Sequence, residues 1–544
     1  MTGAARGRVV DEFAATQAAV EREALLPNLG ALLDQAEARY RARSLWVSID
    51  DRTSLTYGQF AEQTRRCAAA LTSFGVEPGA HVAVMLPSVP AFAITWMALA
   101  RRGAIIVPVN TRVTARELDH VLRESGAEVL IIDREHLETL RQLDGAAAPV
   151  PRERTIVHGG PAPGYPSDWD AMIESASPRA PANRDVDVDQ LASIQFTSGS
   201  TSFPKGCMLS HRYWLVIGSV RSRQGLPASR LLVDLPFHYM GGQWRFLMAL
   251  YTGATVFVAR QTSLSRLLDR LIDFQIDFCT VTSALAKLPD EPRYRDTNLR
   301  WALTAGLNKD FHHGLERRLR APIREVYGST EAGSVLSVPI DAEDTVGSGT
   351  CGLPVAFRSC AIVDPDGREV PAGQSGELWI SGPAMMQGYY KRPDVTAETM
   401  HGAWFKSGDL FRRDRGGYHF LLGRIKDVIR RSGENISAGD VESTLQGMPQ
   451  ILEVAAVAVP DAVRGEEVKI YVSLRSGYTA RDVPPATIMA FSQERLAKFK
   501  LPRYLEYLEQ LPKTASGKIA KQELRAAKTD LRESSFDFAE NRWR

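Results

Sequence analysis

A glycine- and hydroxyl-rich segment at residues 196–206 constrains the fold of this chain more than any other feature. It reads Phe-Thr-Ser-Gly-Ser-Thr-Ser-Phe-Pro-Lys-Gly, with an apolar, strand-like stretch before it at 192–196 and a helix-like stretch after it at 212–220. Glycines let backbone N–H groups approach an anion closely, hydroxyl groups donate further hydrogen bonds, and Lys205 supplies a point charge. The segment therefore predicts a phosphate-binding loop between a strand and a helix.

The residue order at the end of this segment argues against one common kind of phosphate loop. A Walker A loop requires Gly-Lys followed by Ser or Thr, whereas this chain has Lys205-Gly206-Cys207. P-loop kinase and ATPase chemistry therefore loses support. A flexible linker would explain the composition, but it leaves the strand-like and helix-like flanks unexplained.

The composition is typical of a soluble globular protein with two or more domains. The chain has 544 residues, of which 44% are hydrophobic and 24% charged, and its formal net charge is +2. So small a charge predicts neither a nucleic-acid partner nor binding to an anionic membrane. The five cysteines are too few and too scattered for a disulfide framework, and the longest apolar stretch, 91–100, is too short to span a bilayer. We expect a cytoplasmic protein; the sequence is compatible with an oligomer and does not specify one.

Helix and strand patterns alternate along the N-terminal part of the chain. A capping box at 114–117 opens a helix that runs to about Glu124, and residues 129–132 follow as a buried strand. Such alternation predicts a large α/β domain in which helices cover mainly parallel sheets. After residues 364–367, short alternating runs indicate antiparallel strands, which we interpret as a small β-barrel-like subdomain.

The C-terminal part of the chain predicts a separate unit. Helix-like and strand-like stretches alternate again beyond Gly423 and give enough residues for a compact domain. We expect a large N-terminal domain at 1–422, a hinge at 423–427 and a small, mobile α/β domain at 428–544.

Six separated motifs resemble, in order, those of the adenylate-forming superfamily. They are residues 196–206, Tyr327-Gly328-Ser329-Thr330-Glu331, Gly376-Glu377-Leu378, Ser407-Gly408-Asp409, Gly423-Arg424-Ile425-Lys426-Asp427 and Pro512-Lys513-Thr514-Ala515-Ser516-Gly517-Lys518. That superfamily includes acyl-CoA synthetases, peptide-synthetase adenylation domains and beetle luciferases. Residues 431–437 and 498–502 look most like the CoA ligases, including the carnitine and crotonobetaine branch.

The resemblance implies a two-step reaction that makes a carboxylic acid reactive. Hydroxide is a poor leaving group, so this family first forms an acyl-AMP anhydride from ATP with release of pyrophosphate, and then transfers the acyl group to CoA. The implied cofactors are ATP, Mg²⁺ and CoA, and the implied partner is a small carboxylic acid. Attack of a carboxylate on the α-phosphorus joins two anions, which requires cations and oriented donors in the site.

The resemblance also implies roles for residues that contact the nucleotide. Glu331 matches the Mg²⁺ ligand, Tyr327 the residue that packs on adenine, Asp409 the acceptor for both ribose hydroxyls, and Arg424 a cationic group that reaches the nucleotide. Ser407 stands where the family more often has Thr. The residues implied to surround the β- and γ-phosphates are Thr197, Ser198, Gly199, Ser200, Thr201 and Lys205. The remaining implied nucleotide-site residues are Gly306, Gly328 and Thr330.

Four further positions match residues that serve the two half-reactions. Lys518 matches the catalytic lysine that bridges the carboxylate and the α-phosphate in the transition state. Lys426 matches the hinge about which the C-terminal domain rotates between the steps, and Gly433 matches the loop that lines the pantetheine channel. His238 matches the aromatic gate beside the acyl site and argues against an amino-acid substrate. A packed, hydrogen-bonded core histidine is an equally good interpretation of His238.

The sequence departs from the family pattern near the expected acyl pocket, and three other functions remain as alternatives. Residues 304–308 read Thr-Ala-Gly-Leu-Asn where the family often has Gly-Gly-Ala, and 243–245 read Gln-Trp-Arg, so the acyl pocket is aromatic and partly polar in this interpretation. The alternatives are an acyl-AMP ligase that hands its product to a carrier protein, a nucleotide sensor without chemistry, and luciferase-like oxidation. The sequence names neither the acid nor the pathway.

Overall fold

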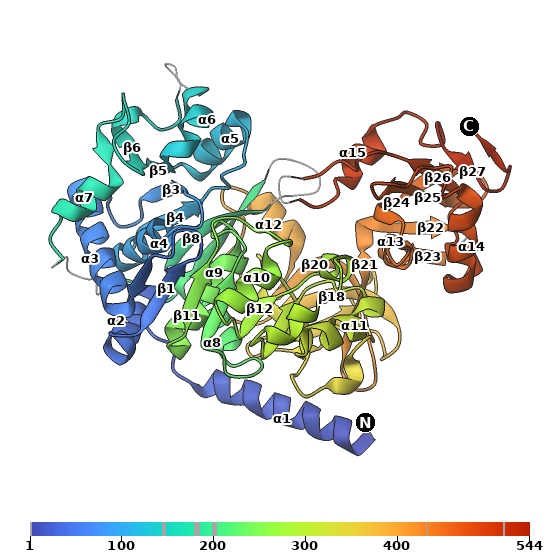
Figure 1. Cartoon of the computed structure of the whole chain (residues 1–544), viewed down its shortest axis with the longest axis horizontal. Coiled ribbons are helices and arrows are strands. Elements are labelled where there is room, and N and C mark those ends of the chain that lie inside the picture. Colours follow the sequence, from blue (N-terminus) through green and yellow to red (C-terminus); the bar gives the residue numbers. More distant parts are fainter. Residues whose placement is uncertain (1–2, 144–147, 179–184, 198–203, 432–433, 515–516) are drawn as a thin grey trace. The chain divides into compact units, whose positions relative to one another are not determined.

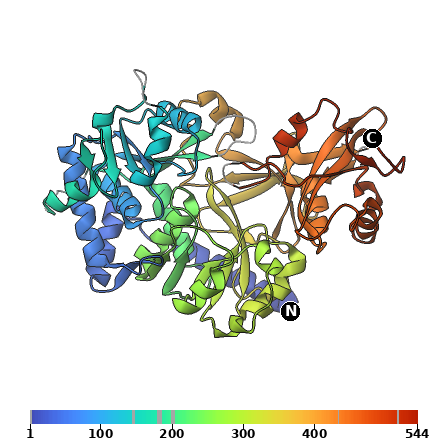
Figure 2. The same ribbon diagram turned by 45° about the horizontal axis from the view of Figure 1, so that its top comes forward.

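The computed structural model describes residues 3–143, 148–178, 185–197, 204–431, 434–514 and 517–544, and the chain falls into two compact units (Figures 1 and 2). The second unit consists mainly of Cys360–Trp379 and Lys406–Arg544. The first unit contains nearly all the rest.

The first unit contains a seven-stranded sheet that is mostly parallel. Its strand order is β7-β6-β5-β3-β4-β8-β9, in which neighbours from β7 to β8 are parallel and β9 is antiparallel to β8. The strands are β3 (His81–Met85), β4 (Ile105–Pro108), β5 (Val129–Asp133), β6 (Thr155–His158), β7 (Ser167–Asp168), β8 (Leu191–Thr197) and β9 (Lys205–Ser210).

A second, nine-stranded sheet in the same unit has the order β16-β15-β14-β13-β12-β10-β11-β1-β2. Its neighbours from β14 to β1 are parallel, and antiparallel strands flank them on both sides. The strands are β1 (Ser44–Ser48), β2 (Ser54–Thr56), β10 (Arg230–Val233), β11 (Thr255–Val258), β12 (Phe278–Thr280), β13 (Trp301–Thr304), β14 (Ile323–Ser329), β15 (Gly333–Ser337) and β16 (Leu353–Pro354). The predicted α/β class with mainly parallel sheets is confirmed.

The main core of this unit lies between the two sheets. Successive side chains of a strand point to opposite faces, so Val82 and Val84 join this core, while Ala83 and Met85 join a separate cluster on the outer face. The helices whose apolar side chains fill the space between the sheets are α2 (Leu29–Tyr40), α3 (Tyr57–Ser73), α4 (Pro90–Arg102), α8 (His211–Ser222) and α9 (Met240–Thr252). The outer faces are covered by α5 (Ala115–Ser125) and α6 (Leu137–Arg141) on one sheet, and by α10 (Leu267–Asp273) and α11 (Lys309–Leu319) on the other.

Local signals in the sequence account for the ends of several helices. The Thr114 hydroxyl accepts a hydrogen bond from the Glu117 N–H, and the Glu117 carboxylate accepts one from the Thr114 N–H, which completes the predicted capping box of α5. The helix ends at Gly126, whose φ of +64° suits glycine. A long helix, α1 (Gly3–Arg22), and the shorter α7 (Trp169–Ser175) and α12 (Pro393–Thr399) complete the α-helices of this unit as far as it is described.

The second unit is built on another seven-stranded sheet. Its order is β23-β22-β25-β26-β27-β28, with β24 paired to β25. Apolar residues of α13 (Ala438–Gln446) and α14 (Pro485–Arg495) cover one face, and α15 (Lys521–Ala526) contributes Leu524 to the other. The strands are β22 (Val428–Arg431), β23 (Glu434–Ser437), β24 (Ile451–Asp461), β25 (Gly465–Leu474), β26 (Tyr504–Tyr507), β27 (Phe536–Asp537) and β28 (Arg542–Trp543).

A smaller sheet precedes this domain along the chain. Its order is β17-β18-β20-β19, with β21 paired antiparallel to β20. A 3₁₀ turn, η6 (Ile425–Asp427), then connects β21 to β22. The strands are β17 (Ser359–Val363), β18 (Ser375–Ser381), β19 (Met400–His401), β20 (Trp404–Arg413) and β21 (His419–Arg424). The second compact unit therefore begins earlier in the sequence than the predicted boundary at 423–427, and the hinge there stays a prediction.

Within the described ranges, no helix combines the length and the apolar content that a membrane crossing requires.

Candidate active site

The predicted phosphate segment is the connection of a β-hairpin. Thr197, the last residue of β8, lies directly opposite Lys205, the first residue of β9. The helix-like stretch expected at 212–220 lies within α8, and strand β9 separates it from the end of the predicted loop. Ser198, Gly199, Ser200 and Thr201 lie outside the described residues. The two ends of the predicted loop are therefore fixed as a cross-strand pair.

Lys205 and Glu331 contact the same tyrosine. The Tyr389 hydroxyl donates a hydrogen bond to Glu331 Oε1 at 3.0 Å, and the Lys205 ammonium lies 5.3 Å from the centre of the Tyr389 ring. That distance is typical of a cation–π contact. Within the described part of the chain, Glu331 Oε2 accepts no hydrogen bond and Lys205 has no carboxylate within ion-pair distance. One carboxylate oxygen and one ammonium are thus available to a ligand.

The turn between β14 and β15 holds Glu331 in place. Gly328 has no room for a side chain, because a Cβ there would lie 2.2 Å from the carbonyl oxygen of Gly333. The carbonyl oxygen of Thr330 accepts a hydrogen bond at 2.9 Å from the hydroxyl of Tyr213, a buried residue of α8. Tyr327 lies on β14, just before these residues. The predicted residues Tyr327, Gly328, Thr330 and Glu331 are therefore brought together.

A buried carboxyl group supports the segment that departs from the family pattern. Gly306 has a φ of +74°, and a Cβ there would meet no atom within 4 Å. The N–H groups of Gly306 and Leu307 donate to the two carboxyl oxygens of Glu325, the second at 3.2 Å. Burial raises the pKa of Glu325 to about 7. No local sequence pattern signals this contact, because Gly306 follows β13 whereas Glu325 lies on the neighbouring strand β14.

His238 is buried and uncharged at neutral pH. Only 6% of its surface is exposed, and its ring lies beside that of Tyr239, with 4.4 Å between the ring centres. Burial, assisted by the charge of Arg112, lowers the pKa of His238 to about 3. Its carbonyl oxygen accepts a hydrogen bond from the Gln195 side chain. The imidazole therefore offers a neutral aromatic surface rather than a charge.

In the second unit, Asp409 and Arg424 form an ion pair. They lie opposite each other on β20 and β21, and Arg424 Nε is 2.7 Å from Asp409 Oδ1. Asp409 is buried, whereas half of the Arg424 side chain is exposed. The N–H of Gly408 donates to Glu377 Oε1 at 2.9 Å, and the N–H of Asp409 donates to the Ser407 hydroxyl at 3.1 Å. The third, fourth and fifth of the six motifs, which contribute Glu377, Asp409 and Arg424, are thus linked by short contacts.

Lys426 and Lys518 are both exposed residues of the second unit. Lys426 lies in η6, next to Asp427, which forms an ion pair with Arg525 at 2.8 Å. Lys518 lies in a loop closed by backbone hydrogen bonds, in which the Thr514 N–H donates to the Lys518 carbonyl at 2.8 Å. In the described part of the chain, no side chain contacts the Lys518 ammonium. Gly433 lies outside the described residues.

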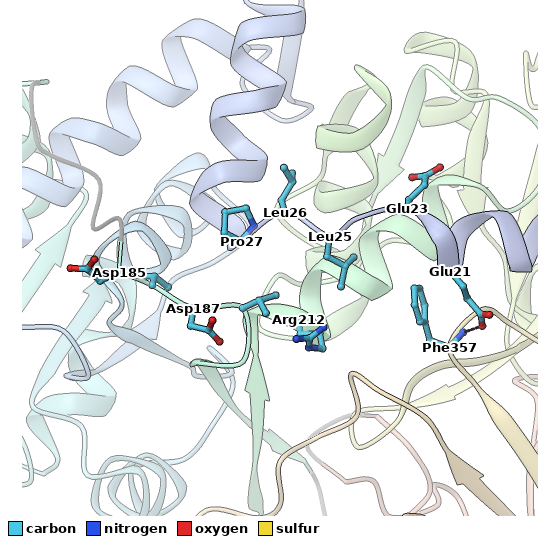
Figure 3. A pocket seen from close by; sticks show the side chains of 11 residues that line it. Glu21, Glu23, Leu25, Leu26, Pro27, Asp185, Asp187, Arg212 and Phe357 are labelled. Atoms are coloured by element: carbon cyan, nitrogen blue, oxygen red, sulfur yellow. Dashed lines mark hydrogen bonds between the residues drawn. The ribbon is translucent and has the colours of Figure 1, made fainter.

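A cavity of about 530 Å³ lies elsewhere in the first unit, between the end of α1, residues 185–188 and α8 (Figure 3). Its two glutamates already have partners. The Glu21 carboxylate accepts a hydrogen bond from the Phe357 N–H at 2.6 Å, and Glu23 pairs with Arg223. None of the predicted site residues lines this cavity, so it is not part of the candidate site.

Comparison with known proteins identifies the family. The sequence model of the family described as AMP-binding enzyme matches residues 33–390. The model of the family described as AMP-binding enzyme C-terminal domain matches residues 440–518. This chain belongs to the AMP-binding enzyme family. It is 34% identical to a feruloyl-CoA synthase from Amycolatopsis sp over 87% of this chain and 94% of the relative.

Two other matches broaden the comparison. The fatty acid–[acyl-carrier-protein] ligase ScoC from Streptomyces coeruleorubidus is 31% identical over 88% of this chain and 92% of its own length. The crystal structure of the anthranilate CoA ligase AuaEII with anthranoyl-AMP superposes with a TM-score of 0.85 at 23% identity, covering 93% of this chain and 98% of that one, and so shows the same fold. The adenylate-forming resemblance is confirmed, and the chain is an AMP-forming acid–CoA ligase that uses ATP, Mg²⁺ and CoA. The carnitine and crotonobetaine likeness stays a prediction.

Proposed function

We propose that this AMP-binding enzyme uses the residues described above to transfer the AMP portion of ATP to a small carboxylic acid, with release of pyrophosphate, and then passes the acyl group to CoA with release of AMP. The observation that carries the assignment of roles is the arrangement of Lys205, Tyr389 and Glu331 beside the hairpin of β8 and β9. It places a cation and a carboxylate within reach of one aromatic ring, next to the connection predicted to bind phosphate.

Glu331 fits a magnesium ligand. Mg²⁺ prefers oxygen ligands and is usually bound by one or two carboxylates together with substrate phosphates, so it does not need a cluster of acidic side chains. The Tyr389 hydroxyl orients one carboxylate oxygen of Glu331 and leaves the other for the ion. Bound Mg²⁺ would neutralise charge on the phosphate oxygens. Lys205 adds a second positive charge for the departing pyrophosphate.

Asp409 and Arg424 are suited to bind the ribose and the rest of the nucleotide. Ribose hydroxyls are hydrogen-bond donors, and the Asp409 carboxylate, held by the guanidinium at 2.7 Å, accepts such bonds. The exposed half of Arg424 is available to a phosphate oxygen at the same time. This role explains why the buried Asp409 carboxylate is paired with Arg424, whose side chain is half exposed to solvent.

Lys518 supplies the charge for the first half-reaction. Its ammonium would bridge the attacking carboxylate and the α-phosphate, where negative charge accumulates in the transition state. The CoA thiolate must later reach the carbonyl that Lys518 had approached, so the second half-reaction needs a different surface. We propose that the small domain at 428–544 rotates about Lys426, within the hinge at 423–427, to exchange these surfaces.

The acyl acceptor separates this proposal from its main alternative. The feruloyl-CoA synthase relative supports CoA, while ScoC, named for an acyl-carrier-protein substrate, supports a carrier protein. We place the enzyme in the cytoplasm, because its five cysteines, all within the described ranges, form no disulfide bond and four of them are buried, as in a reducing compartment.

One assay tests the function and the acceptor together. The enzyme is incubated with ATP, Mg²⁺ and a panel of carboxylic acids, with CoA, with a phosphopantetheinylated carrier protein, or with neither, and AMP, pyrophosphate and thioester are measured by mass spectrometry. We expect acid-dependent AMP and an acyl-CoA. If a thioester forms only on the carrier protein, the acyl acceptor is a carrier protein and not CoA. If no acid supports the formation of AMP, the proposal is overturned.

A further inference from the structure

Two buried arginines of the first unit lie against one tryptophan. The Arg221 guanidinium, from α8, lies 5.1 Å from the centre of the Trp244 ring, and that of Arg245, from α9, lies 4.5 Å from it. Arg221 is 6% exposed and Arg245 is fully buried. Charged side chains are rarely so buried unless a partner of opposite charge accompanies them.

Neither arginine has such a partner. Among the described residues no carboxylate lies within ion-pair distance of Arg221 or Arg245. Arg245 donates to the Gly241 carbonyl and the Thr280 hydroxyl, both at 2.5 Å, and Arg221 donates to Gln224 Oε1 at 2.8 Å. The Nε atoms of both guanidinium groups remain without a hydrogen-bond acceptor.

The two charges are not equally compensated. The Asp234 carboxyl raises the pKa of Arg245 and so opposes the lowering by burial. Burial and the charge of Arg245 lower the pKa of Arg221 to about 9, and no carboxyl group opposes them. Arg221 nevertheless keeps its charge at pH 7. The cluster therefore holds one positive charge more than its own acidic groups neutralise.

Neutral polar groups beside the arginines are also unsatisfied. Both amide atoms of Gln243, which is fully buried, lack a hydrogen-bond partner, and so does Nε2 of Gln224, which is 6% exposed. Buried polar atoms without partners cost free energy, and such a group in a native protein calls for an explanation, such as a bound water molecule, ion or ligand. Two amides and a guanidinium together form a set of donors suited to oxygen acceptors.

The cluster adjoins the elements of the candidate acyl site. Trp244 and Arg245 lie in the first turns of α9, which begins two residues after His238, and Thr280, which accepts a hydrogen bond from Arg245, is paired in the sheet with Leu303, three residues before Gly306. On the other side, Tyr213 is influenced by Arg221 and by Glu331, which act on its pKa in opposite directions. Arg221 lies on the same helix as Tyr213, whose hydroxyl donates a hydrogen bond to the Thr330 carbonyl beside Glu331.

We propose that the acid activated by this enzyme carries a second anionic oxygen group, remote from the reacting carboxylate, and that Arg221, with the amides of Gln224 and Gln243, binds that group. The inference rests on the proposed function and narrows its substrate class. A single anion would neutralise the excess charge of the cluster and supply the missing acceptors. The Trp244 ring, which both guanidinium groups approach, suits a flat or extended carbon skeleton next to the bound anion.

Matched pairs of acids test the proposal. Acid-dependent ATP–pyrophosphate exchange is measured with hexanoate against adipate, benzoate against terephthalate, and cinnamate against 4-carboxycinnamate; 4-sulfobenzoate distinguishes a sulfonate from a carboxylate. We expect kcat/KM for the doubly charged member of at least one pair to exceed that of its partner by about 10²-fold, because a buried charge gains most from a charged ligand. Exchange that always favours the singly charged acid would overturn the inference and leave the proposed function intact.

Two variants assign the effect to Arg221. Arg221→Met should abolish the preference for the doubly charged acid and leave the singly charged acid at or above its wild-type rate, while Arg221→Lys should retain part of the preference. Arg223→Met, which changes an arginine on the surface of the same helix end, is the matched control and should keep it. A preference that survives Arg221→Met would contradict the role of this residue.

Two measurements without ATP separate binding from folding and from catalysis. Thermal unfolding of Arg221→Met should occur at or above the wild-type temperature, because the substitution removes an uncompensated buried charge. Calorimetric titration with each doubly charged acid of the panel should show binding of at least one of them to the wild type and of none to Arg221→Met. If no acid of either kind supports exchange, the proposed function fails, and this titration still decides whether the arginine binds an anion.

Discussion

Glu331 and Lys518, which we expect to act on the same phosphates, are held in opposite ways. Glu331 lies on a turn that leaves no room for a side chain at Gly328, and Tyr389 holds its carboxylate by a hydrogen bond. Lys518 is fixed through its backbone, while its ammonium contacts no side chain in the described part of the chain. A group that binds the ground state gains from being fixed in advance, whereas one that serves a single step must be free to leave afterwards.

Replacing Lys518 by alanine should have the largest effect. We expect acid-dependent ATP–pyrophosphate exchange to fall by about 10² to 10³-fold, as when one electrostatic stabiliser of a transition state is removed. Lys513→Ala is the matched control on the same loop, since Lys513 forms an ion pair with Glu453. Normal exchange in Lys518→Ala would break the comparison, because the free ammonium would then have no role in the first step.

Lys426→Pro should separate the two half-reactions. A proline removes a backbone N–H and fixes φ where the hinge must change its dihedral angles. We expect thioester formation to fall by about 10²-fold through misplacement of the small domain, with a clearly smaller loss in pyrophosphate exchange. Single-turnover measurement of acyl-AMP formation and of its consumption by CoA checks this. Equal rates of both steps in variant and wild type would remove the hinge.

Tyr389→Phe sharpens the comparison on the side of Glu331. Loss of the hydroxyl removes the hydrogen bond that orients the carboxylate, and we expect the Mg²⁺ concentration for half-maximal exchange to rise by about tenfold, the order of one charged hydrogen bond. Tyr390→Phe makes the same chemical change one residue away and should leave the Mg²⁺ dependence unchanged. An unchanged Mg²⁺ requirement in Tyr389→Phe would show that the carboxylate needs no such support.

The smallest expected effect is a pH dependence of stability at Glu325. Its pKa is raised from 4.5 to about 7 in the fold, so its stabilising contribution is fully present below pH 4.5 and is lost as the pH rises through 7. Glu325→Gln should therefore flatten the decline in unfolding temperature between pH 5 and pH 8. The exposed Glu398→Gln serves as control. The same slope in wild type and Glu325→Gln would mean that this carboxyl group is already ionised at pH 5.

Local patterns in the sequence predicted local structure and the family, but not the contacts that complete the site. The capping box at 114–117 and the six motifs each lie within a few residues of chain, and their structural meaning is set there. Tyr389, by contrast, lies 58 residues from Glu331 in the sequence, and no periodicity or motif spacing indicates that its hydroxyl contacts that carboxylate. Strand β9 was missed because its first two residues, Lys205 and Gly206, belong to the segment interpreted as a loop, which leaves only four residues before the helix. The charge excess at Arg221 is visible only once the packing of α8 and α9 shows that no carboxylate accompanies it.

The position of Arg424 sets a limit on exchanging C-terminal halves between relatives. Because Arg424 faces Asp409 on the adjacent strand and directly precedes η6, a chimaera joined between residues 409 and 424 takes the carboxylate from one parent and the guanidinium from the other. A junction within 425–427 keeps both from the same parent. Crossovers should therefore be placed within η6, so that recombination preserves the Asp409–Arg424 ion pair of one parent.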